Sequence, residues 1–215
     1  MYELVRGPLV WIAFIGFFGG LIYQVITMAR LAAKERVVFP TLDARYGLRS
    51  LLHWVVPFGS RNTRMHPGYT TVSYLFHIGV LITPLFLMGH AALWYESWGV
   101  RWWSLPDDVA DVMTLVVIFA CLFFVIRRLV RPEVRNVTTW SDIALALVVL
   151  APFLTGFAAH RQWLAYQPLL IAHIISGAVF LLVIPWTRLV HMIWFAFTRA
   201  YMGSEFGSVR HARDW

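Results

Sequence analysis

The sequence is poor in cysteine and in charge. Its single cysteine, Cys121, lies in an apolar run and has no second thiol to pair with. A disulfide, a cysteine-ligated iron–sulfur cluster and a covalently attached c-type haem each need more than one cysteine, so this chain alone can build none of them. Charged residues make up 13% of the chain, whereas soluble domains contain about a quarter. The scarcity of charge argues against a soluble domain.

Apolar and aromatic residues take the place of the missing charge. Of the 215 residues, 60% are hydrophobic and 16% are aromatic, with 11 tryptophans among them. This composition indicates a membrane protein, and the aromatic residues suit interfacial belts and packing around a flat cofactor. The net charge of +7 would suit nucleic acid only if the basic residues clustered on a soluble domain. They stand between apolar segments instead, so we expect no nucleic-acid partner.

Five apolar segments are long enough to cross a bilayer. We expect an all-α, integral membrane five-helix bundle that forms a single membrane domain over residues 1–215. The first segment has an apolar core too long for a signal peptide and no small-residue cleavage pattern, so we interpret it as a span. The predicted spans are 8–29, 72–94, 109–126, 143–159 and 169–197, with a loop over 30–71 and a tail over 198–215.

The basic residues predict how the spans are oriented. Fifteen of the 18 Lys and Arg residues lie in the loop 30–71, between the third and fourth spans, or from the end of the fifth span onward. The other side has only Arg6, Arg101 and Arg161. Because cytoplasmic loops carry such an excess, we expect the N-terminus outside and the C-terminus in the cytoplasm. The expected location is the inner (cytoplasmic) membrane, as a multi-pass protein in contact with lipid.

Four of the 8 histidines fall inside two of the predicted spans. His77 and His90 lie in the second span, and His173 and His191 lie in the fifth. The two spans run in opposite directions, so His77 shares a depth with His191, and His90 shares one with His173. Ionisable residues within a bilayer are rare, so each one is a candidate functional residue. Two histidines at each of two depths are typical of two low-spin b-type haems, each with two axial imidazoles.

The spacing of the histidines differs between the two spans. His173 and His191 are 18 residues apart, so on a continuous helix both rings would leave the same face, roughly 27 Å from each other. His77 and His90 are 13 residues apart, which gives about 20 Å of rise and directions that differ by about 140°. His90 is therefore the ligand that depends most on a distortion of its helix.

Prolines and glycines lie close to these histidines. Pro84 is expected to kink or locally unwind the second span, and Pro185 is expected to do the same in the fifth. A glycine lets either a porphyrin or a neighbouring helix approach the backbone, and both readings stay open here. The glycines concerned are Gly79, Gly89 and Gly177.

The four histidines also allow interpretations other than haem binding. Each could simply hydrogen-bond a neighbouring helix. Zinc needs about four ligands where a pair offers two, and proton relays commonly use Asp and Glu, which are nearly absent from the spans. A transporter predicts internal repeats and a channel predicts a ring of charge or a filter-like loop, and the sequence has none of these. The sequence favours haem, and a haem-free membrane anchor is the alternative of another class.

Three stretches of the chain resemble the gamma subunit of respiratory nitrate reductase. They are "YLFHIGVL" in the second span, "RRLVRPEVRNVTTWSDIALAL" entering the fourth and "IPWTRLVHMIW" ending the fifth. That subunit is a five-span diheme cytochrome b. Its relatives include the b-type subunits of the Hmc, Tmc and Dsr membrane complexes of sulfate reducers and of heterodisulfide reductase. The resemblance extends over roughly residues 5 to 200.

The resemblance implies a set of haem ligands. His77 and His191 would bind the haem nearer the cytoplasm, and His90 and His173 would bind the haem nearer the outside, which is the pairing that the topology also predicts. Arg188 lies one turn before His191. It is interpreted either as a bidentate partner of a haem propionate or as a positive-inside anchor.

The chain also departs from the nitrate reductase subunit. The histidines of the second span are farther apart than in that subunit, and "LPDDVADVM" has Ala110 where the subunit has a lysine thought to help bind quinol. The loop between the last two spans is reduced to about "HRQWLAYQPL". These differences favour a complex of the sulfate-reducer type, with the gamma subunit of nitrate reductase as the alternative.

The expected function is electron transfer within a respiratory membrane oxidoreductase complex. With two haem b, the chain would pass electrons between menaquinone or another quinone, or an outer-side cytochrome c, and a cytoplasmic iron–sulfur subunit. Further membrane subunits could join the complex, and the tail "SVRHARDW" is expected to dock on a partner. Polar residues expected near the outer face are candidates for quinone chemistry or plain interfacial residues. They are Tyr95, Glu96, Asp107, His160 and Arg161.

Overall fold

The computed structural model describes residues 2–35 and 37–215, and these residues form helices joined by short loops, with no β-strand among them. Five of the helices are long and apolar enough to cross a membrane. The prediction of an all-α, multi-pass membrane protein with five spans is therefore confirmed. The five segments are Tyr2–Lys34, Pro67–Trp98, Asp107–Val130, Trp140–His160 and Tyr166–Trp186.

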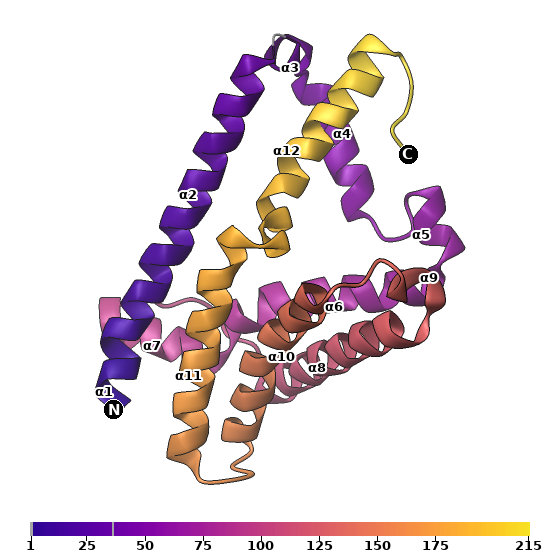
Figure 1. The fold of residues 1–215 in the computed structure, drawn as a ribbon. Helices are drawn as coiled ribbons and strands as arrows, with labels where there is room; N and C mark the ends of the chain where they lie inside the picture. The colour runs from indigo at the N-terminus through magenta and orange to yellow at the C-terminus, as the bar shows by residue number, and fades with distance from the viewer. Residues whose placement is uncertain (1, 36) are drawn as a thin grey trace. The chain divides into compact units, whose positions relative to one another are not determined.

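The helices, which Figure 1 labels, fall into two compact units. The middle unit comprises Thr71–Phe180 with the N-terminal segment up to Arg6, and the terminal unit comprises Gly7–Thr70 and Leu181–Trp215. The helices that lie wholly or mostly in the middle unit are α6 (Pro67–Phe86), α7 (Met88–Trp98), α8 (Asp107–Val130), α9 (Pro132–Arg135), α10 (Trp140–His160) and α11 (Tyr166–Val183). Those of the terminal unit are α2 (Val10–Lys34), α3 (Val38–Thr41), α4 (Ala44–Val55), α5 (Arg61–Met65) and α12 (His191–Ser204).

The core of the middle unit lies where α8 and α10 pack along each other. Val117 and Cys121 of α8 and Phe153 of α10 are buried there. The start of α10 is set by a capping box, in which the backbone N–H of Thr139 donates to Asp142 Oδ2 at 2.8 Å. A Cβ added to Gly79 of α6 would collide with the Val117 side chain, so Gly79 serves helix packing.

The second span is broken between α6 and α7. Leu87 has extended backbone angles (φ −66°, ψ 132°), so the helix stops after Phe86 and restarts at Met88. The distortion expected from Pro84 is confirmed, and it lies three residues farther along the chain. The break leaves three carbonyls without their usual i+4 donors, and each accepts from elsewhere in the middle unit. The pairs are Pro84 O with His90 Nδ1 (2.8 Å), Leu85 O with Trp102 Nε1 (2.8 Å) and Phe86 O with Leu105 N (2.8 Å).

The fifth span is also broken, within the terminal unit. The α-helix ends at Val183, two 3₁₀ turns flank an extended Thr187, and α12 begins at His191. Pro185 lies in the first of these turns, where it has no N–H to donate. The expectation that His173 and His191 share one face of a continuous helix is therefore wrong, because they stand on different helices.

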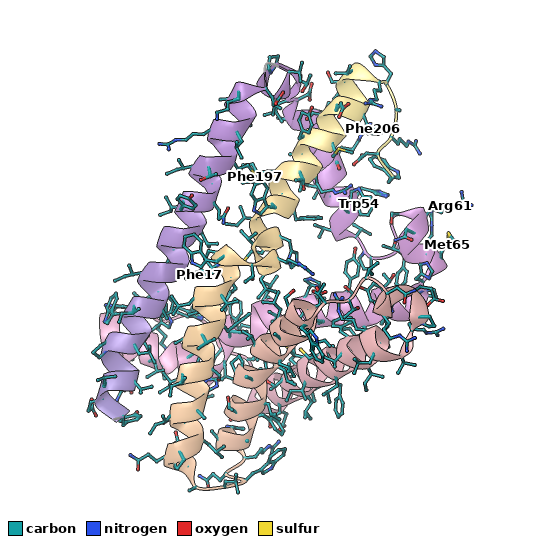
Figure 2. All side chains as sticks on the ribbon, in the orientation of Figure 1. Phe17, Trp54, Arg61, Met65, Phe197 and Phe206 are labelled. Carbon is teal, nitrogen blue, oxygen red and sulfur yellow. The ribbon has the colours of Figure 1, made fainter. Side chains whose placement is uncertain are left out.

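In the terminal unit, α4 packs against α12. Gly47 and Ser50 of α4 and Gly203 of α12 are buried along this contact. A Cβ at Gly203 would approach the backbone oxygen of Tyr46 to 2.7 Å, so only glycine allows the two helices to come this close. The guanidinium of Arg199 lies 4.3 Å from the ring centroid of Trp54, whose position on the ribbon Figure 2 labels.

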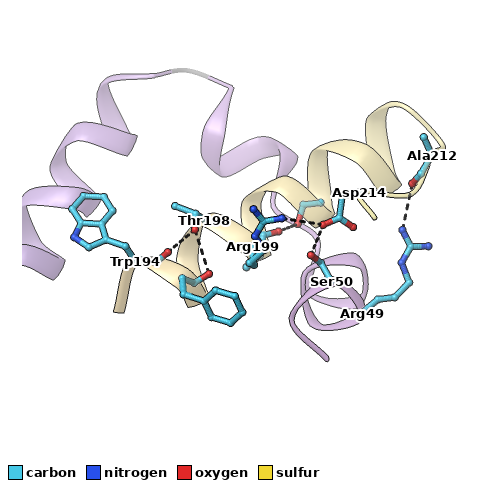
Figure 3. A network of polar contacts seen from close by, with 10 residues as sticks. Arg49, Ser50, Trp194, Thr198, Arg199, Ala212 and Asp214 are labelled. Carbon is cyan, nitrogen blue, oxygen red and sulfur yellow. Dashed lines mark hydrogen bonds and ion pairs between the residues drawn. The ribbon is translucent and has the colours of Figure 1, made fainter. Parts of the chain in front are cut away.

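The tail packs on α4 of the same unit (Figure 3), and its docking on a partner stays a prediction. The Ser50 hydroxyl donates to Asp214 Oδ2 at 2.5 Å, and Arg49 donates to the backbone oxygen of Ala212 at 3.4 Å. The ring of Trp215 stacks on His53 with 4.1 Å between centroids. The chain itself therefore supplies the surface that orders its tail.

Candidate functional site

His90 of α7 and His173 of α11 face each other inside the middle unit. Their ring centroids are 5.8 Å apart and their planes differ by 17°. These two residues are the pair predicted for the outer depth. The break at Leu87 separates α7 from α6, so the phase of a continuous helix, which argued against His90, no longer applies to it.

Hydrogen bonds fix which nitrogen of each ring carries the proton. His90 Nδ1 lies 2.8 Å from Pro84 O, and His173 Nδ1 lies 2.9 Å from Pro152 O. A carbonyl oxygen only accepts, so Nδ1 must donate in both rings, and in the neutral imidazole Nε2 then keeps its lone pair. Histidines that bind metals usually donate their other N–H to such a carbonyl. The two rings therefore carry the tautomer that an axial Nε2 ligand needs.

The other two predicted ligands have the same arrangement, each within its own unit. His77 Nδ1 lies 2.7 Å from the backbone oxygen of Ser73 in α6. His191 Nδ1 lies 2.8 Å from the backbone oxygen of Arg188. Because the acceptor is again a carbonyl, Nδ1 is the donor in both rings. All four predicted ligands thus share one tautomer.

The spacing of His90 and His173 also fits a shared iron. Two metal–nitrogen bonds of about 2 Å, with roughly 1 Å from each nitrogen to its ring centre, separate two axial imidazole centroids by about 6 Å. The observed 5.8 Å is close to this value, but the rings are stacked, so each would have to turn its Nε2 toward a common iron on binding. Among residues 2–35 and 37–215, no three His, Cys, Asp or Glu side chains form a group that could hold a metal ion. A haem iron is different, because it takes only its two axial ligands from the protein.

Gly156 of α10 makes room for the His173 ring. A Cβ at this position would lie 2.8 Å from His173 Nδ1 and 2.9 Å from its Cε1. Sequence analysis missed Gly156, because only the packing of α10 against α11 reveals its role. At Gly89 and Gly177 an added Cβ would meet no atom within 4 Å.

The candidate quinone residues are distributed over several places in the middle unit. His160 and Arg161 converge on Asp111 of α8, a residue that the sequence analysis did not single out. The Arg161 guanidinium donates to Asp111 Oδ2, and His160 Nε2 lies 3.6 Å from Asp111 Oδ1. The Asp111 side chain is 13% exposed, so the carboxylate is largely enclosed. A three-residue polar cluster therefore lies where α8 begins and α10 ends.

The other predicted site residues have different surroundings. Glu96 pairs with Arg6 at 3.5 Å, with both side chains about half exposed or more. Tyr95 is exposed. Asp107 is also exposed and lies in the first turn of α8, where the helix dipole stabilises a negatively charged side chain. Arg188 opens the second 3₁₀ turn of the terminal unit and is exposed.

Five long apolar helices define the chain as a multi-pass membrane protein. No model of a known protein family matches it, and no solved structure matches it. A protein of Nitratidesulfovibrio vulgaris (strain Hildenborough) is 37% identical over 218 residues, which cover 98% of this chain and 95% of that protein. The chain belongs to the same family as this protein. The similarity covers nearly the whole chain and thus both units.

Proposed function

We propose that this chain is a diheme cytochrome b, the electron-transfer subunit of an oxidoreductase complex in the inner membrane. The observation that carries the proposal is the His90–His173 pair, with its 5.8 Å spacing and its Nδ1–H tautomers. Haem bound between these rings would supply one-electron chemistry at its iron. Two axial histidines leave no coordination position for a substrate, which suits electron transfer.

Each residue around this pair has a defined task. His90 and His173 would bind the iron through Nε2, and the carbonyls of Pro84 and Pro152 hold their rings in orientation. Gly156 keeps the space that the His173 ring occupies. Such supporting groups normally determine both the orientation and the basicity of a ligand.

A second haem is proposed from the sequence, with His77 and His191 as its ligands. The support is their common depth in the predicted topology and the Nδ1–H tautomer of each ring taken singly. Arg188, exposed and three residues before His191, remains the candidate for a propionate partner.

Quinol oxidation is proposed at the outer side, near the haem of His90 and His173. Asp111, with His160 beside it and the Arg161 guanidinium donating to it, is the candidate to accept a proton there. Electrons would leave through the second haem toward a cytoplasmic iron–sulfur subunit of the sulfate-reducer type. The gamma subunit of nitrate reductase, and an outer-side cytochrome c as electron partner, are the alternatives.

A haem-free membrane anchor is the second candidate. The observation in its favour is that each of the four rings already makes a hydrogen bond to a helix carbonyl, as a purely structural histidine would.

A difference spectrum distinguishes the two candidates. We expect purified protein to give b-type bands after dithionite reduction and two haems per chain by pyridine haemochrome. His90→Ala and His173→Ala should each remove the same haem, and the exposed His66→Ala is the matched control. A chain that stays colourless when produced with ample haem is the anchor.

A further inference from the structure

The first span carries a polar side chain that is used inside the terminal unit. The Gln24 side chain of α2 donates from Nε2 to the backbone oxygen of Pro185 at 2.7 Å. An amide left unpaired in hydrocarbon is costly. The acceptor lies in the 3₁₀ turn Ile184–Trp186 that interrupts the fifth span. Gln24 therefore donates a hydrogen bond to the interrupted segment of the fifth span.

The break explains why this carbonyl is available. In a continuous helix, Pro185 O would accept from the N–H of Leu189. Leu189 N instead donates to the Thr187 hydroxyl oxygen at 3.3 Å. The Gln24 amide thus replaces the donor that the backbone no longer supplies.

Glycines bring α2 close enough for this bond. Gly16, Gly20 and Gln24 recur every four residues and so share one face of α2. A Cβ at Gly20 would lie 2.6 Å from Pro185 Cβ, and one at Gly16 would collide with the Leu182 side chain. Small residues spaced in this way let two membrane helices approach to backbone contact. The face of α2 that carries Gly16, Gly20 and Gln24 therefore packs closely on this segment of the fifth span.

Hydrogen bonds connect the break to the His191 ring. The Thr187 hydroxyl donates to Val183 O at 2.9 Å, and Thr187 O accepts from Val190 N at 3.1 Å. The second turn then ends with His191, whose Nδ1 donates to Arg188 O. His191 is the first residue of α12, so the geometry of the break determines where its ring points.

We propose that Gln24 is a positioning residue for the haem that His191 binds. By holding Pro185 O, it fixes the break in the fifth span and with it the direction of the His191 imidazole. This inference rests on the proposed function, because it assumes that His191 is an axial ligand.

The test uses the full chain with Gln24→Leu, which keeps a similar volume and removes the donor. Haem per chain, the potentials from a redox titration and the low-spin ferric EPR signals are measured. We expect one of the two haems to be lost or to shift in both potential and EPR position, while the other keeps its wild-type values. Thr187→Val should affect the same haem, because it loosens the same break from within the fifth span.

Gly19→Ala is the matched control on α2, because a Cβ there meets no atom within 4 Å. It should leave both haems unchanged. Unchanged potentials and EPR signals in Gln24→Leu and in Thr187→Val would overturn the inference while the wild-type haems uphold the proposed function. A parallel loss of both haems, with no selective shift, would reduce Gln24 to a general stabilising residue. Wild-type protein without haem would overturn the proposed function and this inference together.

Discussion

At the residue scale, the His173 ring is bounded by α10 on one side. Pro152 O accepts from its Nδ1, and Gly156 leaves the ring the space it needs. Adding one methyl group at Gly156 therefore tests whether the position of the His173 ring matters for haem binding. Gly156→Ala should displace the ring and lower the content of the haem that His90 and His173 bind, as the pyridine haemochrome measures. Gly19→Ala adds the same methyl group where an added Cβ meets no atom within 4 Å, and it should retain both haems.

Asp111 offers a second test at this scale. Asp111→Asn removes the charge that Arg161 and His160 both face. If the cluster accepts the quinol proton, haem reduction by a quinol analogue should slow by roughly 10²-fold, while reduction by dithionite stays unchanged. Asp107→Asn, one turn earlier and exposed, is the control. Equal rates of reduction by the quinol analogue in Asp111→Asn and Asp107→Asn would show that the cluster does not take part in quinol oxidation.

At the element scale, the break between α6 and α7 depends on donors from outside the helix. Trp102→Phe removes the indole N–H that donates to Leu85 O at 2.8 Å. A carbonyl left without its donor costs about 1 kcal/mol or more, so the melting temperature in detergent should fall. The content of the His90 haem should fall with it, because Pro84 O and Leu85 O belong to the same break. Trp103→Phe, whose indole is exposed, should melt like the wild type.

The tail makes a separate contrast between a buried and an exposed carboxylate. The Asp214 side chain is 1% exposed and lies against Ser50 and Arg199. Asp214→Ala should destabilise the terminal unit by about 1–3 kcal/mol. Glu205→Ala removes a more exposed ion pair with Arg210 and should cost less than about 1 kcal/mol. Chemical unfolding monitored by tryptophan fluorescence measures the difference, and equal losses would contradict it.

The features that depend on local sequence could be predicted, and those that depend on contacts between distant residues could not. The five spans follow from local hydropathy, which needs no knowledge of neighbours. Pro84 and Pro185 mark where the helices are interrupted. The side chains that donate to the carbonyls freed by the breaks, Trp102 to Leu85 O and Gln24 to Pro185 O, are not neighbours in the sequence. For the same reason the role of Gly156 was missed. The tail was expected to need a partner because its contacts with α4 are not a local property.

At the scale of the whole molecule, the basic residues predict a single orientation, and the lone cysteine makes it measurable. Cys121 is 2% exposed and should give little background with a membrane-impermeant maleimide. Gln162→Cys, in the turn after α10, should be labelled in intact spheroplasts. Asn136→Cys, after α9, should be labelled only once the membrane is permeabilised. The reverse pattern would invert the topology and with it the assignment of the outer haem.

The bond between Gln24 and Pro185 also bears on how the protein is made. The two residues are 161 positions apart, and the ribosome delivers Gln24 to the membrane before its acceptor exists. Until the fifth span is inserted, the amide has to be accommodated by headgroups, water or the insertion machinery. The span that carries Gln24 therefore reaches its final contacts only after the span that carries Pro185 is inserted, and biogenesis has to keep it mobile in the bilayer until then.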